Sequence, residues 1–267
     1  MIAFASNSLL CRLALKQTAI DPATFTFVRV FSGAVALWLV TNTRRVSLNE
    51  SGNWPSALAL FVYAAGFSFA YVHLAAGTGA LLLFGAVQAT MILWGFHKRE
   101  RLNVIQVLGL VIALVGLVVL VFPGLSAPPL AGSMLMLSAG VAWGIYSLRG
   151  KVAGDAVVVT TGNFVRAVPF AVALSVSLIS RAHVDFAGIG YAIISGAITS
   201  GLGYVIWYSA LSGLKATSAA AVQLSVPVLA AAGGILLLGE PITLRYVFAS
   251  VAVLGGIALV IWETRGR

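Results

Sequence analysis

The polar and aromatic residues that could bind a small solute lie inside long apolar runs of this sequence. A polar side chain that faces lipid costs several kcal/mol, so we expect such residues to turn towards other helices or towards an aqueous passage. Their amide, guanidinium, hydroxyl and indole groups suit hydrogen bonding to a solute and stacking on its apolar part. The predicted substrate-binding residues are Asn7, Gln88, Trp143, Asn163, Arg166, Tyr204, Trp207, Tyr208 and Gln223.

Arg166 is the sharpest of these candidates, because it lies about ten residues into its apolar run and therefore near mid-membrane. An arginine at that depth costs roughly 2.5–3.5 kcal/mol on insertion scales. Its functional interpretation is an anchor for an anionic or carboxylate group. The alternative is a structural arginine that bonds to backbone carbonyls or reaches the interface. Its counterpart Arg29, identified below by an internal repeat, favours the structural alternative.

Three aromatic residues recur at helical spacing, which places Tyr204 and Trp207 on one face with Tyr208 beside them. Because they lie deep in their run, they could form a cavity wall. The alternative is an interfacial belt, where Trp and Tyr collect. Gln88 and Gln223 could contact a solute or could form hydrogen bonds across helices instead.

The residues needed for catalysis or for the usual ion relay are missing from the apolar runs. Every acidic residue falls at the end of a run or in a loop, so no mid-membrane carboxylate is expected for a proton or sodium relay. No zinc-binding, Walker or nucleophile-elbow motif occurs. Cys11 stands alone, which excludes an internal disulfide and a cysteine-based metal cluster. We therefore expect no cofactor, no bound metal and no enzymatic activity.

The composition indicates a protein that crosses the membrane several times. Of its 267 residues 60% are hydrophobic and 9% are charged, and the mean hydropathy is +1.04. Soluble domains carry about 25% charged residues. The net charge of +9 could suggest a nucleic-acid partner, but the basic residues are scattered among apolar runs and form no face or tail. The expected surroundings are a lipid bilayer, with no nucleic acid bound.

The apolar runs predict an all-α protein of about ten transmembrane helices, five in each half of the chain. The predicted spans of the first half are Ile2–Leu15, Ala23–Thr41, Trp54–Leu74, Gly77–Phe96 and Leu102–Phe122. Those of the second half are Ala131–Leu148, Val157–Ser180, Gly188–Leu211, Ala216–Leu238 and Tyr246–Trp262.

The two halves resemble each other, which predicts a duplicated unit. The run Phe27-Val28-Arg29 matches Phe164-Val165-Arg166 at an offset of 137 residues, and Glu100 matches Glu240 at an offset of 140. The expected repeats span residues 1–124 and 130–263. An odd number of crossings per repeat makes the second copy enter the membrane from the opposite side, so the two repeats are expected to be inverted.

The scattered basic residues predict the orientation. Under the ten-span scheme most of them fall on one side, including Arg44, Lys98, Arg149, Lys215 and Arg265. The positive-inside rule makes this side cytoplasmic and places both termini there. The first span is short against its repeat partner, so either it is a short, mismatched helix or the native chain begins upstream of Met1.

Several motifs together resemble the drug/metabolite transporter superfamily, specifically its bacterial EamA-type members. The residues that carry the resemblance are Asn7, Arg29, the turn at residues 98–102, Trp143-Gly144, the run from Gly203 to Leu211, Pro227 and Leu238-Gly239-Glu240-Pro241. The chain departs from the family at Lys98-Arg99-Glu100, where Leu-Gly-Glu is usual, and in its short first helix.

This resemblance implies a carrier of the bacterial inner membrane with a central cavity between its repeats and alternating access. Our hypothesis is a secondary transporter, an exporter of a small metabolite such as an amino acid, acting as a monomer or a homodimer. A membrane scaffold without a transport function and a membrane enzyme are the alternatives.

Overall fold

The computed structural model describes residues 1–43, 52–97, 104–122, 124, 127–150, 154–211, 223 and 225–265, and the regular elements in these ranges are all helices. The first half contributes α1 (Ile2–Gln17), α2 (Pro22–Thr43), α3 (Trp54–Tyr71), α4 (Ala76–His97) and α5 (Val104–Val121). The second half contributes α6 (Leu130–Gly150), α7 (Ala156–Ser177), the short η1 (Ile179–Arg181), α8 (Phe186–Ile193), η2 (Ile194–Leu202), α9 (Gly203–Leu211), α11 (Ser225–Leu238) and α12 (Leu244–Arg265).

These helices confirm the prediction of an all-α membrane protein. Among the described residues, seven helices are long and apolar enough to cross a bilayer, and the segment from α8 through α9 forms one of them. Shorter apolar helices cover Ser225–Leu238 and Leu244–Val260, and α1 has 16 residues. The count of ten crossings remains a prediction. The proposed turn at residues 98–101 and the start of the ninth span lie outside the described residues.

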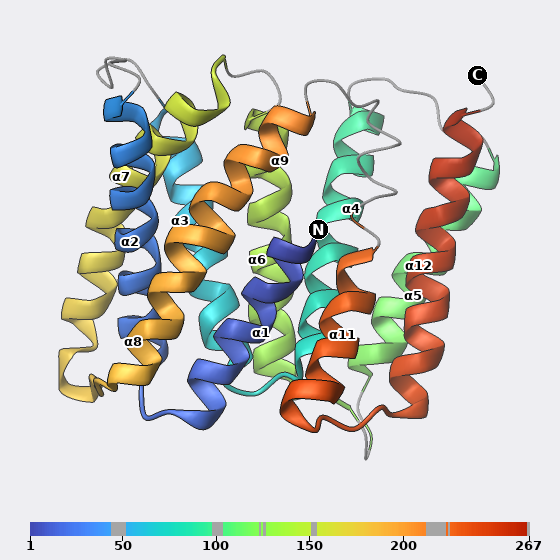
Figure 1. Cartoon of the computed structure of the whole chain (residues 1–267). Coiled ribbons are helices and arrows are strands. Elements are labelled where there is room, and N and C mark those ends of the chain that lie inside the picture. The colour runs from blue at the N-terminus through green and yellow to red at the C-terminus, as the bar shows by residue number, and fades with distance from the viewer. Residues whose placement is uncertain are drawn as a thin grey trace.

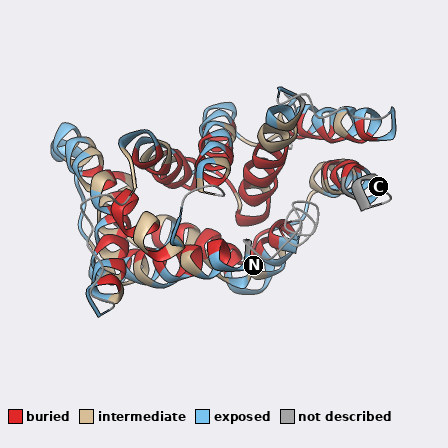
Figure 2. Cartoon of the chain, turned by 90° about the horizontal axis from the view of Figure 1, so that it is seen from above, coloured by how far each residue is buried: buried red, intermediate tan, exposed pale blue. Residues whose placement is uncertain are grey.

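The helices run side by side with their connections at the two ends (Figure 1), and from above they lie in two facing rows (Figure 2). The way they pair is consistent with a duplication. Helices that correspond in the two halves pack on each other, namely α2 on α7, α4 on α11 and α5 on α12. The third helix of one half also packs on the first helix of the other: α3 packs on α6, and α8 and η2 pack on α1. Viewed from above, the buried faces of the helices turn towards each other and the exposed faces turn outward (Figure 2). This pairing supports the predicted inverted repeats, which stay a prediction.

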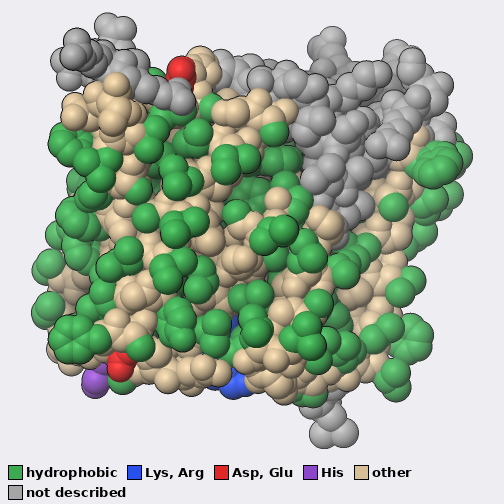
Figure 3. All heavy atoms as spheres, in the orientation of Figure 1, with side chains coloured by type: hydrophobic (Ala, Val, Ile, Leu, Met, Phe, Trp, Pro, Cys, Tyr) green, Lys and Arg blue, Asp and Glu red, His purple; other side chains and the backbone are tan. Residues whose placement is uncertain are grey.

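The outer surface is apolar, as expected of a protein surrounded by lipid. Large hydrophobic side chains are exposed along α5 and α12, among them Val111, Val118, Phe248 and Val251. One face of the molecule is covered by hydrophobic side chains, with the few charged groups visible there at its upper and lower edges (Figure 3). Polar residues such as Asn7 and Arg29 are buried in the interior instead. A soluble protein has the reverse arrangement, with polar residues mostly on its surface.

The turn between α11 and α12 is fixed by a helix-ending motif. Gly239 has a φ of 62°, a left-handed conformation that suits glycine. The Gly239 N–H donates to Ile235 O and the Glu240 N–H donates to Gly234 O, both at 3.1 Å. These two bonds satisfy carbonyls at the end of α11 and turn the chain back towards the bundle. The Gly-Glu-Pro sequence therefore directs the Glu240 side chain inward.

Glu240 and Arg12 together connect α1 to the ends of α3, α4 and α11. Its Oε1 accepts from Arg12 Nε of α1 at 3.0 Å, and its Oε2 accepts from the Ala76 N–H, the first residue of α4, at 2.7 Å. Arg12 in turn donates through Nη1 to the carbonyls of Tyr71 and Val72 at the end of α3. Both side chains are mostly buried, with relative exposures of 13% for Arg12 and 7% for Glu240. The sequence placed Glu240 at a span end, and the structure adds that its carboxylate is buried and paired there.

Replacing Glu240 by glutamine tests this junction. Glu240→Gln leaves the Arg12 charge without its counter-ion in a mostly buried place, so we expect the free energy of unfolding in detergent to fall by about 3 kcal/mol, as for other broken buried pairs. The matched control is Asp185→Asn, because Asp185 accepts from the Gly188 N–H at the start of α8 and asparagine caps a helix equally well. Equal stability of Glu240→Gln and the wild type would show that this junction contributes little.

Candidate functional site

Arg29 lies in the interior of the bundle, with a relative exposure of 2%. Its Nη2 donates to the Tyr63 hydroxyl of α3 at 3.0 Å and to the Tyr204 hydroxyl of α9 at 3.2 Å. Its Nε donates to Ser200 Oγ of η2 at 3.2 Å. Helix α2 of the first half therefore supplies a guanidinium that binds residues from both halves of the chain.

The charge of Arg29 is stabilised by neutral hydroxyls and aromatic rings. In the described part of the chain, the ion pair found within 4.0 Å is Arg12 with Glu240, and no carboxylate lies that close to Arg29. The Arg29 guanidinium carbon lies 4.7 Å from the centre of the Phe67 ring and 5.2 Å from that of Tyr63, which favours the cation. Its Nη1 is buried and has no hydrogen-bond partner among the described residues. An unmet donor of this kind costs about 1–3 kcal/mol, and more on a charged group.

Asn7 ties the first helix to the same place. Its Nδ2 donates to the Tyr63 hydroxyl at 3.2 Å, while its Oδ1 accepts from Ser195 Oγ at 2.5 Å and from Thr199 Oγ1 at 3.2 Å. Both hydroxyls come from η2, a nine-residue π-helix. Such wide turns are rare and occur often at functional sites, because they alter the direction in which side chains point.

Aromatic rings complete the site. Trp143 of α6 has its ring centre 4.6 Å from that of Tyr204 and 4.9 Å from that of Tyr63. Phe4 of α1 lies 5.8 Å from both Trp143 and Tyr204. We call this group of residues the central cluster: Phe4, Asn7, Arg29, Tyr63, Trp143, Ser195, Thr199, Ser200 and Tyr204.

The structure brings three of the predicted site residues into this cluster, namely Asn7, Trp143 and Tyr204. Trp207 lies at its edge, 5.9 Å from Phe4 between ring centres, and its buried Nε1 has no hydrogen-bond partner among the described residues. Tyr208 packs on Tyr146 at 5.9 Å. All three aromatic residues of the helix are buried, with relative exposures of 0%, 5% and 8% for Tyr204, Trp207 and Tyr208. This burial argues against an interfacial belt, and the cavity wall stays a prediction.

The predicted amides other than Asn7 make contacts between helices outside the cluster. Gln88 Nε2 donates to Gln223 Oε1 at 3.4 Å. A bond across helices was one of the two alternatives for these residues. Asn163 Oδ1 accepts from the Asn53 N–H at 2.9 Å, and its Nδ2 donates to the Tyr146 hydroxyl at 3.5 Å. Their contact with a solute stays a prediction.

Arg166 is half-buried and donates through Nη1 to Gly162 O of its own helix at 3.0 Å. The central guanidinium is that of its repeat partner Arg29, which the sequence analysis had used only as evidence for a structural role. Tyr63 and the π-helix were not predicted either. The repeat gave no signal for Tyr63, because at the offset of 137 residues that relates Arg29 to Arg166 it corresponds to Ser200.

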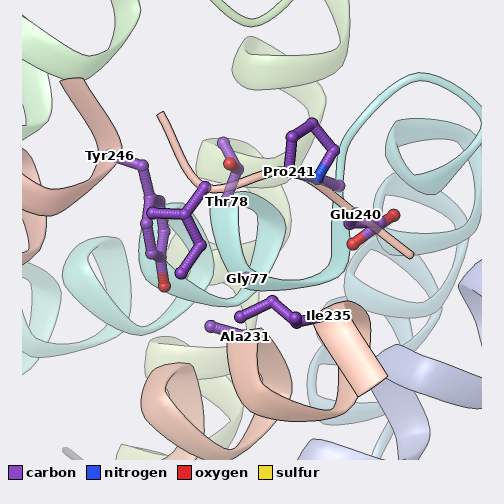
Figure 4. A pocket seen from close by; sticks show the side chains of 9 residues that line it. Gly77, Thr78, Ala231, Ile235, Glu240, Pro241 and Tyr246 are labelled. Carbon is purple, nitrogen blue, oxygen red and sulfur yellow. The ribbon is translucent and has the colours of Figure 1, made fainter. Parts of the chain in front are cut away.

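A separate small pocket of about 20 Å³ lies beside the α11–α12 turn. Figure 4 shows Glu240 and Pro241 on one side of it and the Tyr246 side chain on the other. A Cβ added at Gly77 would lie 2.8 Å from Ala231 Cβ and 3.0 Å from Tyr246 Oη, so glycine is needed for this close packing. The pocket shares no residue with the central cluster; its lining is Ala75, Gly77, Thr78, Ala231, Ile235, Glu240, Pro241, Ile242 and Tyr246.

The Tyr63 hydroxyl is the shared partner of Asn7, Arg29 and Tyr204, which makes it the test of the cluster's cohesion. We expect Tyr63→Phe to lower the free energy of unfolding by about 1–3 kcal/mol, because several buried polar groups lose a partner at once. Tyr191→Phe, at a half-buried tyrosine outside the cluster, should change it by less than half as much. Equal effects of the two substitutions on thermal unfolding would argue against a cohesive cluster.

Known proteins resemble this chain along its length. The EamA-like transporter family matches residues 130–262. A Pseudomonas aeruginosa protein of uncharacterised function is 56% identical, over 100% of this chain and 93% of its own length. An uncharacterised transporter of Archaeoglobus fulgidus is 31% identical, over 77% of this chain and 76% of its own.

Two further likenesses concern function and fold. A probable amino-acid metabolite efflux pump of Salmonella typhimurium is 27% identical, over 72% of this chain and 69% of its own length. One solved crystal structure shares the fold with a TM-score of 0.67 at 17% sequence identity, covering 99% of this chain and 98% of the other. The interior cluster built from both halves, the apolar surface and these relatives lead to one identification: the chain belongs to the EamA-like transporter family of the drug/metabolite transporter superfamily, and it is a transporter, not an enzyme.

Proposed function

We propose that this protein is a secondary transporter, an exporter of small metabolites such as amino acids, and that its solute passes through the central cluster. The observation that carries the proposal is the position of this cluster. Hydrogen-bonding groups and rings from α1, α2, α3 and α6 meet those from η2 and α9 in the interior, where polar groups are otherwise costly. The name of the Salmonella relative supports the choice of amino acids as substrate class.

The proposed mechanism is alternating access between two inverted five-helix repeats, residues 1–124 and 130–263. Corresponding helices of the halves pack on each other at α2 with α7, α4 with α11 and α5 with α12. Interfaces of this kind allow one repeat to rock against the other around a fixed site. The Arg12–Glu240 junction closes one end of the bundle in this conformation, and opening that end requires these helix ends to separate.

We further propose that transport does not need a carboxylate proton relay. In the described ranges, Asp21, Asp155 and Asp185 accept hydrogen bonds from N–H groups at the starts of α2, α7 and α8, outside the bundle interior. Glu240 is held by Arg12 at the end of the bundle. Facilitated diffusion, or coupling through groups other than carboxylates, suits this arrangement best.

The remaining expectations concern the cellular setting. We propose the bacterial inner membrane, with both termini in the cytoplasm and a monomer or homodimer as the working unit. Arg149 is one of the basic residues on the side proposed to be cytoplasmic. It donates to Ser56 and Asn53 at the start of α3. Reporter fusions at each end of the chain test the orientation.

Transport by the purified protein in proteoliposomes tests the proposal. We expect saturable uptake of radiolabelled apolar amino acids without an imposed pH gradient, because the described interior provides no carboxylate relay. Asn7→Ala should lower the uptake rate about tenfold or more, as expected when a cluster loses several polar contacts. The matched control is Asn42→Ala, at an exposed position near the end of α2.

The possible outcomes separate the alternatives. Uptake that occurs only with a pH gradient would contradict the uncoupled mechanism but keep the transporter. Equal losses for the two asparagine variants would remove the cluster from the solute path. A complete absence of flux with every labelled amino acid would contradict amino-acid transport and favour a scaffold or another substrate class.

A further inference from the structure

We infer that Arg29 is the anion subsite of this transporter and that it binds the carboxylate group of an organic solute. The inference rests on the transport function proposed above, since it names the chemical class of the solute. It also moves the anionic anchor from Arg166 of α7, where the sequence suggested it, to the interior guanidinium of α2.

The first observation is an incomplete set of hydrogen bonds. Arg29 uses Nε and Nη2 for the hydroxyls of Ser200, Tyr63 and Tyr204, whereas Nη1 is buried without a partner among the described residues. Guanidinium groups bind carboxylates strongly because their N–H groups form a planar fork. Both Nη2 hydrogens already donate to Tyr63 and Tyr204, so Nη1 carries the guanidinium donors that are still unmet, and the solute carboxylate supplies the missing acceptor.

The second observation is an uncompensated charge. Arg29 is permanently positive, and in the described part of the chain no carboxylate lies within 4.0 Å of it. Arg12, by contrast, is mostly buried and has the Glu240 carboxylate as its counter-ion. A single buried positive charge is neutralised by a single negative charge. A carboxylate supplies it, while a phosphate dianion would bring a surplus charge into the membrane interior.

The surroundings indicate what the rest of the solute is like. Rings of Phe4, Trp143 and Tyr204 lie next to the guanidinium cluster, with centres 4.6 to 5.8 Å apart. The Tyr63 hydroxyl accepts from Asn7, Arg29 and Tyr204, so its own hydrogen can donate to a carboxylate oxygen. The site therefore suits a carboxylate attached to a flat or apolar body.

Benzoate and benzamide are the matched probes, because they have the same ring and nearly the same shape and differ in charge. The purified protein in detergent is titrated with each, and with inorganic phosphate, while its thermal unfolding temperature is recorded. We expect benzoate to raise this temperature and benzamide and phosphate to raise it at least several-fold less. Equal shifts with benzoate and benzamide, a larger shift with phosphate, or no shift with any of the three would overturn the inference.

Two arginine variants assign the effect to a residue. Arg29→Gln should weaken benzoate binding by about tenfold or more, since it removes a charged donor. Arg166→Gln, the same change at the repeat partner, should keep the benzoate response. The opposite pattern would return the anchor to Arg166 and overturn the inference. If Arg29→Gln does not fold, Arg29→Lys keeps the charge without the fork, and it must respond to benzoate more weakly than the wild type.

This experiment and the uptake assay can fail independently. A benzoate response through Arg29 without any amino-acid flux would keep the carboxylate subsite and remove the proposed transport of amino acids. In the opposite case the flux depends on Asn7, but Arg29→Gln still binds benzoate normally. That result would keep the transporter and remove the subsite.

Discussion

A polar group at membrane depth gains no hydrogen bond from lipid, so its partners have to come from the protein or from a bound solute. This constraint accounts for the contrast between an apolar exterior along α5 and α12 and an interior that holds Asn7, Arg29 and the hydroxyls of η2. The bonds run between halves of the chain, as from Arg29 to Ser200 across 171 residues. The arrangement of the two halves and the chemistry of the interior therefore depend on the same contacts.

The charges of Arg12, which is mostly buried, and of Arg29, which is fully buried, are stabilised in different ways. Arg12 has a carboxylate, Glu240, and together they connect α1 to the ends of α3, α4 and α11. Arg29 has hydroxyls, rings and an unmet donor. A paired charge suits a fixed junction, because breaking the pair is costly. A charge without a counter-ion suits a site that binds and releases an anion, which is what a carrier needs at its centre.

Apolar runs and turn residues predicted the helices well, since span length and Gly-Glu-Pro chemistry are local properties. Asn7, Trp143 and Tyr204 were predicted site residues and all three are buried in the central cluster, while their contact with a solute stays a prediction. The choice between Arg29 and Arg166 could not be made locally, since both follow Phe-Val. The structure distinguishes the two by tertiary packing, since Arg29 is the one that bonds to η2 and α9. The Arg12–Glu240 pair, 228 residues apart, and the π-helix depend on tertiary contacts in the same way.

The most direct test of the account is access to the central cluster from each side of the membrane. Thr199→Cys in a Cys11→Ser background places a single thiol in the cluster, since Cys11 is the only cysteine of the chain. A membrane-impermeant thiol reagent is then applied to vesicles of each orientation, with and without a transported amino acid. The account predicts labelling from both sides and protection by the solute. Labelling from neither side, or from one side only under every condition, would contradict a passage through the cluster.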